Sequence, residues 1–330
     1  MLFISFTVRY NALYYPFVTI IGIILMNRSK ILSGVICLVI CSILIGKFIS
    51  FNIEKYNELA STRQFSAFSG WQIANNAMYA YKFVERSNLK KLPTKFQELD
   101  NLVRSYFDST TNNINHPEGK WLAGTIYMWT NSTPLRMYMH MKYGNKEEKD
   151  FENWSKISPF YKEYGIELIK SYPLEFFRFY LYPNFLKYYN PPVEFLQNYS
   201  TGVDTVAPVA KFWFNYKSSK LNTIFKDYKV NVLNYQPILV GILNSLFLFS
   251  LLTSLVMKIN AYNKHLRKLT ILVVALWLFN LGFSILVSPI ALRFQLFPMM
   301  IISSYLILYF EKLILILRSP EIGKLDKIIN

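Results

Sequence analysis

The stretch PILVGILNSLFLFSLLTSLVM, residues 237–257, decides the fold class because it contains no charged side chain. About 20 consecutive apolar residues form a helix long enough to cross the hydrocarbon core of a bilayer. The stretch that follows, KINAYNKHLRK at 258–268, holds Lys258, Lys264, Arg267 and Lys268 and no acid. Short cytoplasmic loops are enriched in lysine and arginine. The two stretches together predict a membrane span that ends on the cytoplasmic side.

Four more apolar runs flank this span, at 10–26, 31–49, 269–287 and 294–317. If the basic turn near Arg28, the basic loop and the tail face the cytoplasm, the polar stretch between the second and third spans lies outside. For the start of the chain, one helix over 1–26 with a buried arginine is the alternative, and that arginine would need a partner. We expect an all-α fold of polytopic transmembrane helices with a large, mainly helical extracytoplasmic domain. The predicted domains are an N-terminal transmembrane hairpin (1–50), the extracytoplasmic helical domain (51–235) and a C-terminal three-helix transmembrane region with a cytoplasmic tail (236–330).

Composition agrees with this class, since 52% of the 330 residues are hydrophobic and only 17% are charged. The net charge of +16 is typical of nucleic-acid binding, but no recognition motif accompanies it. Many of the basic residues occupy the short connections between spans, as membrane orientation requires. Cys37 and Cys41 lie four apart in an apolar run and are expected to pack. We therefore expect the lipid bilayer as a partner, no nucleic acid and, because no histidine–cysteine cluster has ligand spacing, no metal.

The polar stretch between the spans has helical patterns and no sustained strand alternation. Apolar residues recur at three and four between 65 and 84, and again after Pro93 at Phe96, Leu99, Val103 and Phe107. Further helices are expected at 135–143 and 160–171, separated by a charged linker at 144–153. Residues 172–192 are so aromatic that we expect them at the membrane surface, where tyrosine and tryptophan favour the headgroup layer.

Acidic residues favour chemistry at the outer face. Seventeen of the twenty lie in 51–235, and the other three are Glu311, Glu321 and Asp326. Glu311 lies near the tail end of the span at 294–317, and the other four spans hold no acid. The membrane interior is therefore expected to hold no carboxylate of the kind that relays protons or cations, which argues against an ion-coupled transporter.

Three arginines are expected at the outer boundary of the membrane: Arg9, Arg178 and Arg293. They either anchor helix ends by extending to the headgroups or hold the phosphate of a lipid carrier, since a guanidinium offers a bidentate donor fork. Lys187 is placed to assist, and tyrosines such as Tyr182 are suited to stacking on sugar rings. An interfacial aromatic belt explains the tyrosines equally well.

Several motifs resemble a set of bacterial polytopic proteins. They are RYNA at 9–12 leading into a span with Pro16, GWQIANNAMY at 70–79, the stretch from Arg178 to Pro192, and RFQLFP at 293–298. These proteins are similar to the GT-C class of glycosyltransferases. The resemblance implies a bacterial inner membrane location and a polyprenyl phosphate sugar as donor, with no cofactor otherwise indicated.

The resemblance also implies that the catalytic acid has no counterpart in this chain. GT-C enzymes usually carry the catalytic acid in the first outer loop, and Met1 aligns beyond that point, so we expect the chain to be the C-terminal part of such a protein or to begin with a short re-entrant segment. Glu175, Glu194 and Asp204 are the candidate substitutes for that acid, and Asp204, which an ordinary turn also explains, is the one to test first.

Sugar or acceptor binding is expected at Trp71, Asn75, Asn76 and Tyr182. The adjacent asparagines either bind sugar hydroxyls or bridge neighbouring helices. Two functions stay open: a glycosyltransferase-related protein at the outer face, and a non-catalytic envelope scaffold whose outer domain binds a partner.

Overall fold

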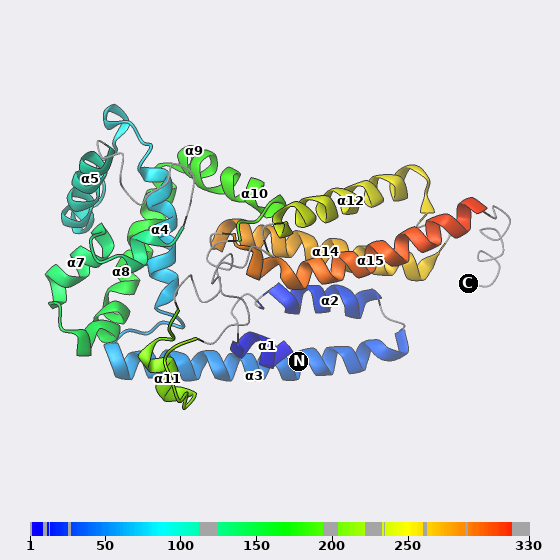
Figure 1. The fold of residues 1–330 in the computed structure, drawn as a ribbon, viewed down its shortest axis with the longest axis horizontal. Helices are drawn as coiled ribbons and strands as arrows, with labels where there is room; N and C mark the ends of the chain where they lie inside the picture. The colour runs from blue at the N-terminus through cyan, green and yellow to red at the C-terminus, as the bar shows by residue number, and fades with distance from the viewer. Residues whose placement is uncertain are drawn as a thin grey trace. The chain divides into compact units, whose positions relative to one another are not determined.

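The structure, a computed structural model, describes residues 2–8, 12, 14–25, 28–111, 124–193, 204–221, 233, 235–259, 263–287 and 290–318. Every regular element in these ranges is a helix, as Figure 1 shows. The β pairing printed for them is one isolated antiparallel bridge between Thr205 and Lys220. The predicted all-α class is confirmed.

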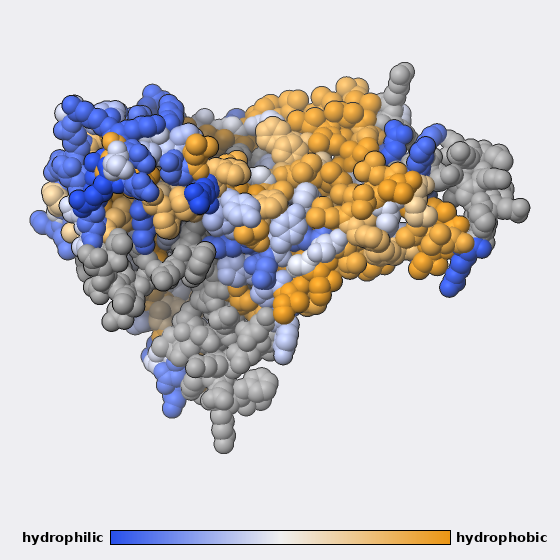
Figure 2. All heavy atoms as spheres, turned by 90° about the horizontal axis from the view of Figure 1, so that it is seen from above, coloured by the Kyte–Doolittle hydropathy of each residue, from blue (hydrophilic) through white to orange (hydrophobic). Residues whose placement is uncertain are grey.

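Four helices are long and apolar enough to cross a membrane: α3 (Arg28–Ala60), α12 (Gln236–Val256), α14 (Lys264–Val287) and α15 (Leu292–Arg318). Figure 2 shows hydrophobic residues gathered over α12 and its neighbours, and hydrophilic residues over the region of α5 (Gln97–Thr111). These four helices characterise an integral membrane protein. Each of them overlaps one of the predicted spans.

The fifth predicted span, 10–26, is not among them. Within the described residues it contains α2 (Tyr15–Leu25), a helix of 11 residues, preceded by α1 (Leu2–Val8). At 1.5 Å per residue, α2 is only about 17 Å long, against about 30 Å of hydrocarbon. The helices long enough to cross a membrane therefore number four among the described residues, and the span predicted at 10–26 stays a prediction.

Packing divides the chain into two compact units. Unit 1 comprises Met1–Phe185 and Leu278–Pro289, and unit 2 comprises Leu186–Trp277 and Ile290–Asn330. The three predicted domains were defined by membrane topology rather than by packing, so they stay a prediction.

The core of unit 1 is built on α4 (Phe68–Tyr81) and α8 (Asp150–Ser171). The two helices approach at glycines. A Cβ added to Gly70 would lie 1.9 Å from the carbonyl oxygen of Ser158, and one added to Gly165 would lie 2.7 Å from the backbone nitrogen of Ala74. Only glycine permits backbones this close. Around this pair lie α5, α6 (Ile126–Trp129), α7 (Pro134–Tyr143), α9 (Pro173–Phe176) and the π-helical turn η5 (Phe177–Leu181). Helix α10 (Tyr182–Tyr189) follows η5, and its last four residues belong to unit 2.

Helix α8 begins earlier than predicted. The sequence suggested a charged linker at 144–153 and a helix from Phe160, but the helix begins at Asp150 and continues through Pro159. Asp150 and Glu152 lie in its first turn, where negative charge is favourable to the helix dipole. Trp154 and Ile157, before the proline, are buried in the core. Tertiary packing therefore extends the helix past a residue that normally interrupts one.

In unit 2, polar side chains connect apolar helices. Phe247 of α12 packs edge-on against Tyr305 of α15 at 5.6 Å between ring centroids. Asn244 accepts a hydrogen bond from the Trp277 indole at 3.3 Å. Thr253 and Tyr309 share a hydrogen bond of 2.7 Å between their hydroxyls. Such bonds hold helices together where apolar side chains alone give no preference for protein over lipid.

Candidate functional site

Arg178 is an exposed cation fixed on aromatic rings. It lies in η5, and its guanidinium carbon is 5.3 Å from the centroid of the Phe179 ring. That ring stacks on Phe83 with a centroid distance of 4.3 Å. No ion pair of Arg178 is found among the described residues. A guanidinium oriented by cation–π contact and facing outward suits an anion supplied from outside the chain.

Large apolar side chains surround this arginine on the surface of unit 1. Those exposed on α9, η5 and the start of α10 are Leu174, Phe177, Tyr182 and Phe185. An exposed apolar segment with a basic residue is typical of a helix that lies in a membrane interface. That residues 172–192 lie at the membrane surface stays a prediction.

Of the three other predicted phosphate ligands, two belong to unit 2 and one lies outside the described residues. Arg293 and Lys187 belong to unit 2, and the Arg293 guanidinium carbon lies 4.7 Å from the ring centroid of Phe294. Arg9 lies outside the described residues. A shared phosphate site for these four cations therefore stays a prediction.

Trp71 is buried rather than presented to a ligand. Its indole N–H donates to the Trp154 carbonyl at 2.9 Å, and its ring stacks on Trp154 at 5.3 Å and meets Tyr161 edge-on at 4.7 Å. An aromatic group packed on two sides holds helices together. In the described arrangement, Trp71 has a structural role between α4 and α8.

The neighbouring amides bridge segments of unit 1. Asn75 donates to the Gly124 carbonyl at 2.8 Å and Asn76 to the Val287 carbonyl at 3.2 Å. Gln72 donates to the side-chain oxygen of Asn76 at 2.6 Å. All three side chains are buried. This geometry matches the helix-bridging alternative, and sugar binding by Trp71, Asn75 and Asn76 stays a prediction.

Asp204 lies at the base of a short closed loop, where its backbone carbonyl accepts a hydrogen bond from the Leu221 N–H at 2.8 Å. Asp204 is adjacent to the isolated antiparallel bridge between Thr205 and Lys220. Within the described ranges, no group of three or more histidine, cysteine, aspartate or glutamate side chains could hold a metal ion. A catalytic role for Asp204 stays a prediction.

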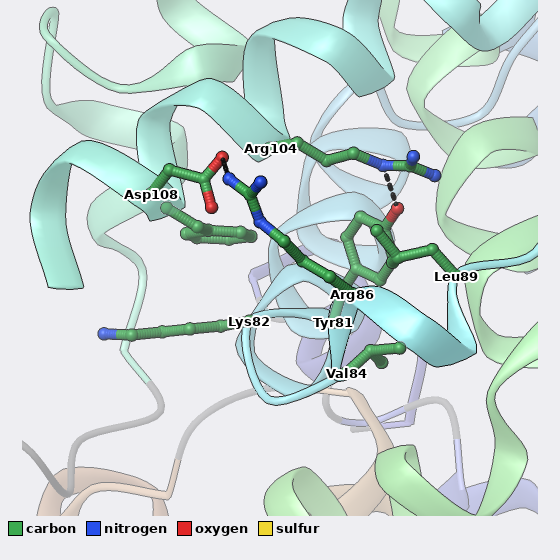
Figure 3. A pocket seen from close by; sticks show the side chains of 8 residues that line it. Tyr81, Lys82, Val84, Arg86, Leu89, Arg104 and Asp108 are labelled. Atoms are coloured by element: carbon green, nitrogen blue, oxygen red, sulfur yellow. Dashed lines mark hydrogen bonds and ion pairs between the residues drawn. The ribbon is translucent and has the colours of Figure 1, made fainter.

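Sequence reasoning missed a charged pocket between the end of α4 and helix α5. Its volume is about 390 Å³, and Figure 3 shows Arg86 reaching toward Asp108 while Arg104 reaches toward Tyr81. The Arg104 Nε donates to the Tyr81 hydroxyl at 2.8 Å. The lining residues are Tyr81, Lys82, Val84, Arg86, Leu89, Arg104, Phe107 and Asp108.

Behind this pocket lies a buried carboxylate network. Asp100 accepts hydrogen bonds from the Tyr81 hydroxyl at 2.9 Å and the Tyr164 hydroxyl at 3.1 Å, and it pairs with Arg104 at 2.7 Å. Burial raises the pKa of Asp100 above its ordinary value, opposed by Arg104 and the two hydroxyls. The i,i+4 spacing of Asp100 and Arg104 is a sequence signal for the pair. The tyrosine partners come from other helices and carry no such signal.

The arginines of the pocket already have acidic partners. Arg86 pairs with Asp108, and Arg104 with Asp100. Such pairing leaves little positive charge for an added anion. We interpret the pocket as the surface of a structural network rather than as a binding site.

The buried tyrosines of unit 1 should make its fold less stable at alkaline pH. Burial raises the pKa of Tyr161 and Tyr164 well above that of an ordinary tyrosine. Their folded-state pKa exceeds the unfolded value of about 10, so their contribution is complete below pH 10 and is lost as pH rises further. Thermal unfolding at a series of pH values should show a falling midpoint above about pH 10, and Tyr161→Phe should make this fall less steep. An unchanged midpoint up to pH 12 would contradict the prediction.

Comparisons with protein-family models, with curated proteins and with solved structures find no match.

Proposed function

We propose that the chain is a GT-C-like bacterial inner-membrane protein that binds a sugar carried on polyprenyl phosphate, at the outer face of the membrane. The observation that carries this proposal is Arg178, an exposed guanidinium held over an aromatic ring and surrounded by exposed apolar side chains. A lipid carrier presents a phosphate beside hydrocarbon. A basic group within an interfacial apolar segment matches both parts of that ligand.

The first role of these residues would be to bind the lipid carrier. Arg178 would donate to the phosphate oxygens, with Arg9, Arg293 and Lys187 as further candidate ligands and Tyr182 as a stacking surface for the sugar. Transfer would also need a carboxylate to deprotonate the acceptor hydroxyl, a contribution of about 10²–10⁴-fold in rate. Asp204 is the candidate for this step.

A non-catalytic envelope scaffold is the second candidate. The observation that favours it is the burial of Trp71, Asn75 and Asn76, which connect helices of unit 1 instead of facing a ligand. Under this proposal the outer domain binds a partner, and Arg178 anchors its segment at the headgroups.

Replacing Arg178 by alanine separates the two proposals. A hydrogen bond to a charged group contributes about 1.5–3 kcal/mol, so Arg178→Ala should weaken binding of polyprenyl phosphate by about 10–100-fold. Arg178→Lys should recover part of the affinity because it keeps the charge but not the bidentate fork. Binding would be measured by titrating polyprenyl phosphate into the full chain in nanodiscs.

Arg63→Ala provides the matched control, since Arg63 is an exposed arginine of the same unit outside this segment. Its affinity should equal that of the original chain. If Arg178→Ala binds polyprenyl phosphate as tightly as this control does, the carrier proposal is wrong and the anchoring role remains. Single replacements of Arg9, Arg293 and Lys187 then show which of them belong to the same site.

A further inference from the structure

A compact loop at 204–221 in unit 2 carries aromatic side chains that are exposed on its surface. The exposed fractions are 85% for Phe212, 78% for Trp213 and 68% for Phe214. Val209 and Tyr216 beside them are exposed as well. Contiguous exposed apolar surface of this kind marks an interaction site.

The loop is closed on itself by backbone hydrogen bonds. At its base the Val206 N–H donates to the Ser219 carbonyl and the Leu221 N–H to the Asp204 carbonyl, both at 2.8 Å. At its tip, α11 (Pro208–Trp213) begins with a proline, and the Tyr216 N–H returns to the Lys211 carbonyl at 3.0 Å. Backbone groups paired within the loop need no water, so its tip can enter a less polar layer at lower cost.

Asn215 produces the turn that groups the aromatic rings. Its φ of 50° is in the left-handed region, which asparagine adopts more readily than most residues. Phe214 before this turn and Tyr216 after it stack with a ring centroid distance of 5.6 Å. The rings of Phe214 and Tyr216 therefore form one local surface.

The charge around the rings is positive. Lys211, Lys217 and Lys220 are exposed, and with Asp204 they give residues 204–221 a net charge of +2. Within the described residues, none of the three lysines forms an ion pair. Exposed tryptophan, tyrosine and phenylalanine bordered by lysine match the headgroup layer of a bilayer that contains anionic lipid.

The loop is also tethered near a bilayer. Leu221 precedes the first residue of α12 by 15 positions, which at about 3.5 Å per residue allows at most about 50 Å of chain. The surface at which that apolar helix begins is therefore within its reach. We infer that loop 204–221 docks in the headgroup layer of an anionic bilayer through Phe212, Trp213 and Phe214, with its lysines on the lipid phosphates.

Trp213 allows a direct test in the full chain. The chain and its Trp213→Phe variant would be placed in nanodiscs of phosphatidylcholine carrying brominated acyl chains, with and without phosphatidylglycerol. The fluorescence difference between the two chains isolates Trp213. Docking predicts that this difference is quenched by bromine, more strongly when phosphatidylglycerol is present. The same subtraction with Trp129→Phe, an exposed tryptophan of unit 1, serves as the control.

Removing the lysines tests the charge. Each basic residue near an anionic surface contributes about 1 kcal/mol, so Lys211→Ser, Lys217→Ser and Lys220→Ser should each reduce the ratio of docked to undocked loop about fivefold with phosphatidylglycerol present. Quenching of Trp213 by aqueous acrylamide but not by brominated lipid would overturn the inference. So would bromine quenching that is independent of phosphatidylglycerol, or shielding that occurs only when other membrane proteins are present.

Discussion

Gly70→Ala is expected to destabilise unit 1 by about 3 kcal/mol, the upper part of the usual range for overpacking. The added methyl carbon would lie 1.9 Å from the Ser158 carbonyl oxygen. A backbone atom cannot rotate away as a side chain can, so α4 and α8 must separate. Separation would loosen the stack of Trp71 on Trp154. Thermal unfolding in detergent, followed by near-ultraviolet circular dichroism of the tryptophans, measures the effect.

Gly46→Ala is the matched control for this substitution. Gly46 lies in α3, and a Cβ added there meets no atom within 4 Å. Alanine has the higher helix propensity by about 1 kcal/mol, so stability should stay equal or rise. Gly165→Ala should behave like Gly70→Ala, since its methyl would lie 2.7 Å from the backbone of Ala74. Equal midpoints for Gly70→Ala and Gly46→Ala would show that α4 and α8 are farther apart than described.

The sequence predicted helices better than it predicted their ends. The apolar run at 31–49 located α3, but the helix continues to Ala60. Hydropathy indicates where a span leaves the bilayer, whereas a helix ends where a residue such as glycine or proline interrupts its backbone. Residues 50–60 contain neither, so the helix continues past the apolar run. The predicted start at residue 160 was too late, because the buried Trp154 and Ile157 extend α8 across Pro159 to Asp150.

The candidate site was less predictable because side-chain direction is decided by packing. The apolar pattern between 65 and 84 correctly indicated a helix. Asn75 and Asn76 are nevertheless buried against Gly124 and Val287, which are distant in sequence. Arg178 could be chosen because its aromatic neighbours adjoin it in the chain. Asp100 could not be chosen in this way, since its partners Tyr81 and Tyr164 come from two other helices.

Asp100→Ala is expected to lower the free energy of unfolding of unit 1 by about 3–5 kcal/mol, the range for breaking a buried ion pair by removing one partner. The side chain of Asp100 is only 6% exposed, and Arg104 and two tyrosine hydroxyls all depend on it. Without the carboxylate, the two buried tyrosine hydroxyls lose their acceptor and Arg104 loses its acidic partner. Thermal unfolding at neutral pH, compared with the original chain, measures the loss.

Glu98→Ala is the control because it removes a carboxylate from the same helix. Glu98 pairs with Lys142 at 2.6 Å, but both side chains are about half exposed, and such a pair contributes only about 0–1 kcal/mol. Combining Asp100→Ala with Arg104→Ala should restore part of the loss, since the second change removes the unpaired cation. If Asp100→Ala is no more harmful than Glu98→Ala, the hydroxyls of Tyr81 and Tyr164 find acceptors elsewhere. The charged pocket beside them would then need another explanation than a structural one.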